Sequence, residues 1–202
     1  MIELAPSDRP RKVELIVLGR GLAPALIAAR LAEAGRRVAW LVERPGLQTG
    51  RIQIAQGDAP LDAWLQEWQP GGGSSPAGEG WQLDLDMLLP ALAAQVAAHD
   101  HCWATVGTWV RGISVIEQRV LGAIAEDSRY DAKRIVNAAE GPRYAAFARM
   151  LRHPESFRTD RRTPPLPASA TPVEGAWQLS AEGDATTALT AALGLADHLV
   201  DR

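Results

Sequence analysis

The chain has 202 residues, of which 47% are hydrophobic and 22% charged, and its net charge at pH 7 is −3. This composition is typical of one globular domain, and without a basic stripe it argues against nucleic acid as a partner. Cys102 is the only cysteine, which excludes disulfides and cysteine-based metal sites within one chain, and the four histidines lack metal-ligand spacing. No apolar stretch approaches the roughly 20 residues that cross a bilayer, and no secretory signal is present, so we expect a cytoplasmic protein without a membrane partner.

The first predicted elements are a strand, a glycine turn and a helix. Residues 13–18 are mostly branched and apolar, as in a parallel strand that is buried on both faces. Gly19 and Gly21 follow without Cβ atoms, so the N–H groups that begin the next helix, at Leu22 and Ala23, can approach a pyrophosphate. We therefore expect a phosphate-binding turn here.

A second strand and an acid complete this unit. The alanine-rich helix ends at Gly35, and residues 37–43 form a second buried strand. Glu43 lies 24 residues after Gly19, near the offset of about 20 at which a carboxylate binds adenosine ribose hydroxyls. Pro24, at the third position of the glycine motif, has no N–H to donate. The order of elements predicts a dinucleotide-binding fold, and a buried α/β turn without a ligand is the alternative.

The next segment is predicted to be mostly irregular. Residues 44–57 have no helical period and predict an extended loop. Residues 58–68 predict a short helix with Trp64 and Trp68 on one face. Residues 70–80, PGGGSSPAGEG, predict a flexible loop.

The second half alternates between helices and strands. A helix is predicted over residues 86–99, and a proline-rich connection over residues 151–172. Gly183 and Asp184 precede a C-terminal helix over residues 185–200. The whole chain, residues 1–202, predicts a single α/β, Rossmann-like domain. Its central parallel sheet contains strands near residues 13–18, 37–43, 102–106, 134–138 and 176–180, and a small antiparallel three-stranded meander lies near residues 109–125, with Gln118 at a hairpin corner.

This order of elements resembles the FAD-dependent oxidoreductases of the glutathione-reductase-like fold, in the branch of D-amino-acid dehydrogenases, glycine oxidase and sarcosine oxidase. The opening GRGLAPALIAARLAEAGRRVAWLVER is similar to the first βαβ unit of that family, and EGAWQLSAEGDATTALTAALGLADHLVD to its C-terminal strand, turn and helix. The resemblance implies an FAD cofactor. The positions it implies as cofactor contacts are Gly19, Gly21, Leu22, Ala23, Glu43, Arg44, Thr49, Gly50, Arg51, Val110, Ala138, Gly183 and Asp184.

Three departures from that family bear on function. Pro24 replaces the third glycine, and Glu140 stands where the turn after residues 134–138 normally ends in glycine, which places a carboxylate near the expected phosphates. The chain also has only short connections where full-length members carry a substrate domain. Because the catalytic side chains of the family usually come from that domain, no catalytic residue is assigned.

Three functions remain open. The first is a small flavoprotein oxidoreductase acting on a small amine or amino acid, possibly with a partner subunit. The second is a non-catalytic scaffold or binding protein that keeps the fold, and the third is an NAD- or other nucleotide-binding protein. Loss of a substrate domain would uncover apolar surface, so self-association or a partner is expected there, with four tryptophans as candidates to line it: Trp64, Trp68, Trp81 and Trp109.

Overall fold

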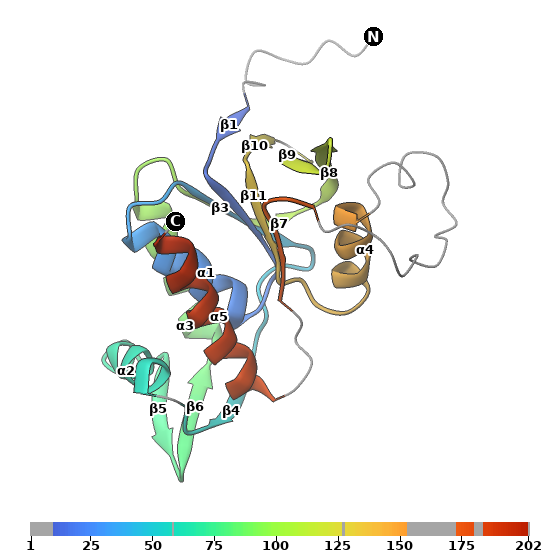
Figure 1. Ribbon diagram of the computed structural model, residues 1–202. Coiled ribbons are helices and arrows are strands. Elements are labelled where there is room, and N and C mark those ends of the chain that lie inside the picture. Colours follow the sequence, from blue (N-terminus) through green and yellow to red (C-terminus); the bar gives the residue numbers. More distant parts are fainter. Residues whose placement is uncertain (1–9, 58, 127, 153–172, 180–183, 202) are drawn as a thin grey trace.

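A five-stranded parallel sheet lies at the centre of the computed structural model, which describes residues 10–57, 59–126, 128–152, 173–179 and 184–201 (Figure 1). The strand order is β12-β11-β2-β3-β7, and every neighbouring pair is parallel. All five predicted strands are confirmed, with these bounds: β2 Leu15–Leu18, β3 Val38–Glu43, β7 Trp103–Thr108, β11 Arg134–Asn137 and β12 Ala176–Gln178.

Alternate residues of the central strands face opposite sides of the sheet and so create two cores. Val17 and Trp40 pack with helices on one face, and Ile16 and Leu41 pack with the antiparallel strands on the other. Figure 1 shows the three helices of the first face side by side. They are α1 Leu22–Glu33, α3 Leu85–Ala98 and α5 Ala185–Val200. Gly35, at φ +75°, follows the end of α1 as predicted.

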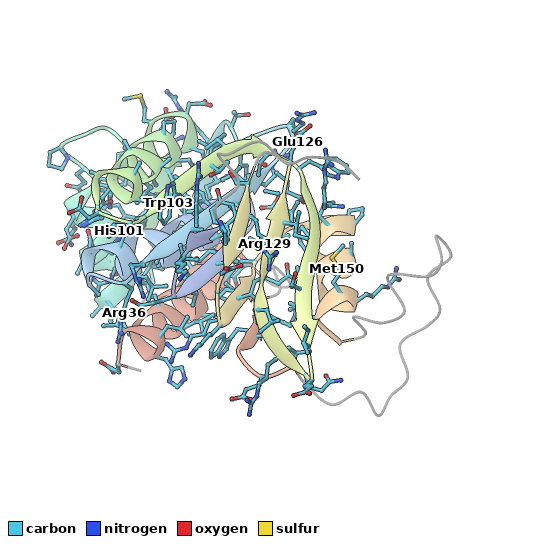
Figure 2. The ribbon with its side chains drawn as sticks, turned by 90° about the horizontal axis from the view of Figure 1, so that it is seen from above. Arg36, His101, Trp103, Glu126, Arg129 and Met150 are labelled. Carbon is cyan, nitrogen blue, oxygen red and sulfur yellow. The ribbon has the colours of Figure 1, made fainter. Side chains whose placement is uncertain are left out.

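The second face carries the predicted meander and an additional helix. Strands β8 Val110–Ile116, β9 Arg119–Ala125 and β10 Arg129–Asp131 are antiparallel, and β1 Arg11–Lys12 extends their sheet as a parallel edge strand. Glu117 and Gln118 both have positive φ at the predicted hairpin corner. Figure 2 shows these strands, with Arg129, and helix α4 Gly141–Arg152, with Met150, on the same side of the parallel sheet.

A third sheet corrects two expectations of irregular structure. β4 Arg51–Ala55 lies within the expected extended loop, and β5 Ser74–Ala77 within the expected flexible loop. Both pair with β6 Gly80–Asp84 between them. Pro76 is tolerated because β5 is an edge strand, and Gly80 is required because a Cβ there would lie 2.2 Å from the Ile54 carbonyl oxygen.

The tryptophans only partly follow the expectation of an uncovered apolar surface. Trp64, on α2 Ala59–Glu67, is buried, and so is Trp81, whose indole N–H donates to Asp62 at 2.9 Å. Both belong to the core on the helical face of the parallel sheet, so they do not line an open surface. Trp109 is 47% exposed and remains a candidate. The proline-rich connection lies almost entirely outside the described residues, and none of the described helices is long and apolar enough to cross a membrane.

Candidate dinucleotide-binding site

The glycine turn after β2 is held in one conformation by its neighbours. Gly19 has φ +139°, and a Cβ there would lie 2.4 Å from the carbonyl oxygen of Ala138. The indole N–H of Trp40 donates to the Gly19 carbonyl at 2.8 Å, and the Gly19 N–H donates to the Leu41 carbonyl at 3.2 Å. Only glycine can occupy this position, and two hydrogen bonds fix the turn to β3.

Helix α1 begins directly after this turn without a side-chain cap. Gly21 is its N-cap residue, and no side chain accepts from the first turn, so the N–H groups of Leu22 and Ala23 have no partner within the helix. Pro24 occupies the third position and contributes no N–H; its ring lies against Gly19. The helix start therefore offers two donors and a positive dipole end to an anion.

Two cavities border this helix start. The first, the Arg143 cavity, has a volume of about 410 Å³ and is bordered by Gly19, Arg20, Glu43, Arg44, Glu140 and Arg143. The second, the Leu189 cavity, has a volume of about 370 Å³ and is bordered by Leu22, Ala23, Gln48, Ala138, Glu140 and Leu189, among others. Glu140 is common to both. The two cavities thus adjoin at the glycine turn, where the diphosphate of a dinucleotide is expected.

The acid predicted to bind ribose is already paired. Glu43 is buried at the end of β3, and the guanidinium of Arg143 reaches both of its carboxylate oxygens, with Nε 2.6 Å from Oε2. The N–H of Val110 also donates to Glu43, at 3.2 Å, and Arg143 donates to the Val110 carbonyl at 3.2 Å. Trp109 and Phe147 lie against the guanidinium, with ring centroids 4.9 and 4.8 Å away.

Arg143 is the residue that sequence reasoning missed. It lies 100 residues after Glu43, on helix α4, which was not predicted. The structure does place Glu43 and Val110 in contact, but Arg143 donates hydrogen bonds to both, to the Glu43 carboxylate and to the Val110 carbonyl.

Arg20 and Glu140 would have opposite effects on the binding of an anion at this turn. The Nε atom of Arg20 is buried without a hydrogen-bond partner in the described structure and borders the Arg143 cavity, so an acceptor is missing there. Glu140 is exposed, and its carboxylate lies over Gly21, since a Cβ on Gly21 would be 2.6 Å from Oε1. A phosphate would satisfy Arg20 and would be repelled by Glu140 until that side chain turns to solvent.

The other implied contacts are distributed over the site. Arg44 borders the Arg143 cavity and donates to Glu126 at 2.8 Å. Arg51 pairs with Asp84 at 3.0 Å, and the Gly50 N–H donates to Asp86 at 3.2 Å. Thr49, Gly50 and Arg51 border neither cavity; from this segment Gln48, Ile52 and Gln53 do.

The start of α5 is the second helix N-terminus at the Leu189 cavity. Asp184 caps it, accepting from the Thr187 N–H and hydroxyl, both at 2.9 Å. These hydrogen bonds lower the pKa of the Asp184 carboxyl below its ordinary value. Ala185 and Ala188 also border the cavity, whereas Gly183 lies outside the described residues. No metal-binding cluster of His, Cys, Asp and Glu occurs in the described part of the chain.

Comparisons with known proteins find similar folds among solved structures but no similar sequence. No protein-family model and no curated protein sequence matches the chain. The structure of THI4 from Thermovibrio ammonificans matches with a TM-score of 0.61 and 14% identity, over 94% of this chain and 89% of that protein. PqsL, a probable FAD-dependent monooxygenase from Pseudomonas aeruginosa, matches with a TM-score of 0.55 and 14% identity, over 77% of this chain and 48% of that one. The flavin-dependent brominase Bmp2 matches with a TM-score of 0.52 and 13% identity, over 69% and 41%.

The chain shares a mixed α/β, Rossmann-type fold with these proteins. At these identities the likeness concerns the fold alone. The chain spans less than half the length of PqsL and Bmp2 but matches nearly all of THI4. The fold therefore also occurs in another protein at about the extent seen here.

Proposed function

We propose that this chain binds FAD in the two adjoining cavities, with the diphosphate at the start of α1. The observation that carries the proposal is the buried Nε of Arg20, which has no hydrogen-bond partner among the described residues, beside an uncapped helix N-terminus and a turn that only glycine can form. Three donors thus face the place where a diphosphate belongs in this fold.

The residues of the Arg143 cavity would hold the adenosine half. Glu43 is placed to accept from ribose hydroxyls, and the backbone of Val110 to contact adenine, once Arg143 releases both. The residues of the Leu189 cavity would hold the flavin half. Its largely apolar border suits a heteroaromatic ring, and the N-terminus of α5 would face that ring with the positive end of its dipole.

Binding in this site requires two side-chain movements. Arg143 must leave Glu43, and the Glu140 carboxylate must leave Gly21. Glu140 is exposed, so its movement costs little, whereas Arg143 gives up charge-assisted hydrogen bonds to a buried acid. In this structure the adenosine end of the site is therefore closed by the chain's own side chains.

The proposed reaction class is oxidation of a small amine or amino acid, which rests on the resemblance to the D-amino-acid dehydrogenase branch. When bound, the flavin supplies hydride acceptance, and the protein supplies orientation and electrostatics. A partner subunit, or a second copy of the chain, would cover the side of the Leu189 cavity on which a substrate domain lies in longer members.

One observation favours the scaffold alternative. A protein that has given up its cofactor needs another partner for the buried Glu43 carboxylate, and Arg143 is such a partner. The NAD-binding alternative uses the same first βαβ unit but makes no use of a flavin-sized cavity at α5.

A titration with three ligands separates these functions. FAD, NAD and ADP are added to the purified chain, with flavin fluorescence or calorimetry as the readout. We expect FAD to bind more tightly than ADP, because both cavities are occupied, and NAD to bind no more tightly than ADP. Equal binding of FAD and ADP would leave the Leu189 cavity without a role, and no binding of any of the three would favour the scaffold.

A further inference from the structure

A third cavity, lined by basic residues, lies at the opposite end of the parallel strands from the glycine turn. The glycine turn follows the C-terminal end of β2, whereas this cavity is bordered by residues that precede three neighbouring strands: Glu14 before β2, Arg37 before β3 and Lys133 before β11. Because the strands are parallel, the residues that precede them lie together at the N-terminal ends of the strands. The cavity has a volume of about 680 Å³, larger than either cavity of the dinucleotide site.

The border of this cavity is strongly positive in a chain that is negative overall. Six basic residues and two acids line it, a net charge of +4, whereas the chain carries −3. The basic residues are Lys12, Arg36, Arg37, Arg129, Lys133 and Arg134. Such a local excess of one sign in a concave surface concentrates ions of the opposite sign.

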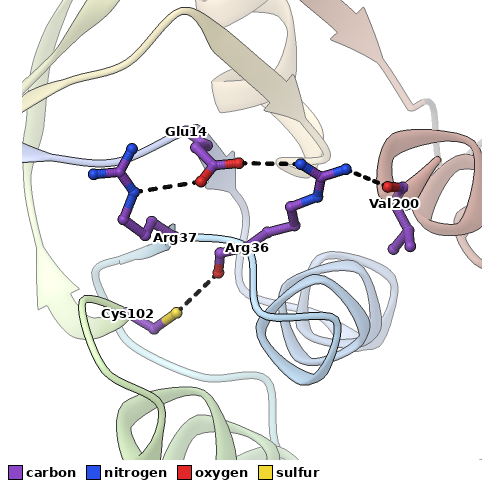
Figure 3. Close-up of polar contacts among 5 residues, drawn as sticks. All are labelled: Glu14, Arg36, Arg37, Cys102 and Val200. Atoms are coloured by element: carbon purple, nitrogen blue, oxygen red, sulfur yellow. Dashed lines mark hydrogen bonds and ion pairs between the residues drawn. The ribbon is translucent and has the colours of Figure 1, made fainter. Parts of the chain in front are cut away.

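The two acids neutralise only part of this charge. Glu14 is shared between Arg37, at 3.3 Å, and Arg36, at 3.5 Å, and Arg36 also donates to the Val200 carbonyl (Figure 3). Asp131 pairs with Arg129 at 3.2 Å.

Three cations of the border have no such partner among the residues that the structure describes. The side chains of Lys12, Lys133 and Arg134 make no hydrogen bond or ion pair with other described residues. They are therefore available to an anion that enters the cavity.

The cationic side chains stand on a backbone that is already ordered. The Val13 N–H donates to the Asp131 carbonyl at 3.0 Å, and the Glu14 N–H donates to the Arg37 carbonyl at 2.7 Å. These bonds tie the segments before β2, β3 and β11 to one another. Binding an anion here would therefore not require ordering of the backbone, which lowers its entropic cost.

We propose that this cavity binds a small molecule with two or more phosphate groups. Its volume is in the range of small-ligand sites, and it is a hollow at the N-terminal ends of the strands, unlike the basic stripe of a nucleic-acid-binding protein. Four of its six basic residues are arginines, whose guanidinium groups match phosphate oxygens in pairs. Val13, Leu121 and Ala132 give the same cavity an apolar part.

Calorimetric titration with inorganic tripolyphosphate tests this proposal. The variant Lys133→Glu reverses one unpaired charge in the cavity, and Arg111→Glu reverses an exposed charge that does not border it. We expect Lys133→Glu to bind about tenfold more weakly than the wild type, and Arg111→Glu to bind like the wild type. The proposal is overturned if the wild type does not bind at physiological ionic strength, or if both variants lose affinity equally.

Two further arms identify the ligand class and the site. Citrate, a tricarboxylate, should bind more weakly than tripolyphosphate; equal or tighter binding of citrate would overturn the assignment to phosphate. Saturation with FAD should leave tripolyphosphate binding by the wild type unchanged, because the two sites lie at opposite ends of the parallel strands. Loss of tripolyphosphate binding in the presence of FAD would place the ion in the dinucleotide site instead.

Discussion

The two cavities beside the glycine turn differ in the number of charged residues that border them. The Arg143 cavity is bordered by three arginines and two glutamates, and its most buried charge, Glu43, is paired within the chain. The Leu189 cavity is bordered mainly by apolar side chains from α1, β4 and α5. A ligand in the Arg143 cavity would therefore have to replace the hydrogen bonds between Arg143 and Glu43. A ligand in the Leu189 cavity would mainly displace water from apolar side chains. If the chain binds FAD as proposed, the Arg143 cavity would contribute to the binding of FAD and ADP alike, and the Leu189 cavity would distinguish FAD from ADP.

Filling the Leu189 cavity should have the largest effect on this comparison. Ala188 borders the cavity from α5, and Ala188→Phe would place a ring where the flavin belongs. We expect FAD affinity to fall about 100-fold, or about 2.7 kcal/mol, while ADP affinity stays unchanged. The control is Ala191→Phe on the exposed side of the same helix. A parallel loss of ADP binding would mean that the two cavities do not act separately.

Removing the acid of the Arg143 cavity should weaken FAD and ADP alike. Glu43→Ala deletes the expected ribose acceptor, and we expect a loss of about 1–3 kcal/mol for either ligand, the range for a hydrogen bond to a charged group. Glu126→Ala, which removes an acid from an exposed pair with Arg44, is the matched control. Calorimetry of both variants is the measurement, and equal FAD affinity of wild type and Glu43→Ala would refute a ribose contact.

Removing the internal partner of that acid should have the opposite sign. Arg143→Ala frees Glu43 and Val110 before the ligand arrives, so we expect FAD and ADP to bind about tenfold more tightly, or by about 1.4 kcal/mol. Arg149→Ala, on the same helix and outside both cavities, should change nothing. Weaker binding by Arg143→Ala would identify Arg143 as a ligand contact and contradict the view that it only closes the site.

The two unusual residues at the turn should have a smaller effect. Pro24→Gly restores a backbone donor, and Glu140→Gly removes a charge near the phosphates. At about 4–6 Å two like charges repel by on the order of 3–4 kcal/mol at an effective dielectric of about 20, but Glu140 is exposed and can turn to solvent. We expect the double variant to bind FAD a few times more tightly, with Glu140→Gln separating the charge from the backbone effect. Unchanged binding in a fluorescence titration would mean that neither residue sets occupancy.

The sequence predicted the fold well where local and tertiary requirements agree. The five parallel strands each occur where expected: β2, β3 and β11 are mainly apolar, largely buried runs, and β7 and β12 are half-buried strands at the two edges of the sheet. β5 was missed because it is an edge strand of small residues and a proline, held by backbone pairing to β6. β4 does alternate, with Ile52 and Ile54 packed in the core, but it is only five residues long and lies in a glycine-containing polar segment. A segment such as PGGGSSPAGEG can still pair at an edge, which composition alone does not reveal.

The candidate site was predictable only in part for a related reason. Gly19, Glu43 and Val110 follow from local spacing or from the resemblance; Gly19 and Glu43 border the same cavity, and the Val110 N–H donates to Glu43. Arg143 becomes a partner of Glu43 only through tertiary folding of α4 against β8. Arg20 could have been identified from the sequence, because it is a charged residue between the two glycines of the predicted phosphate-binding turn.

The smallest expected effect concerns pH and the cap of α5, at the Leu189 cavity. Bonds from Thr187 lower the pKa of Asp184 from 3.8, so the ionised cap stabilises the folded state above that pH, and this contribution is lost as the pH falls through the lowered folded value. Asp184→Ala should therefore lower the Tm at neutral pH, and the difference from wild type should shrink in acid. Asp184→Asn keeps a capping oxygen without the charge, so its difference from the wild type isolates the titrating part. A Tm difference between Asp184→Ala and wild type that does not change with pH would show that the charge of Asp184 adds nothing to the cap, and that the start of α5 is held by its hydrogen-bond geometry alone.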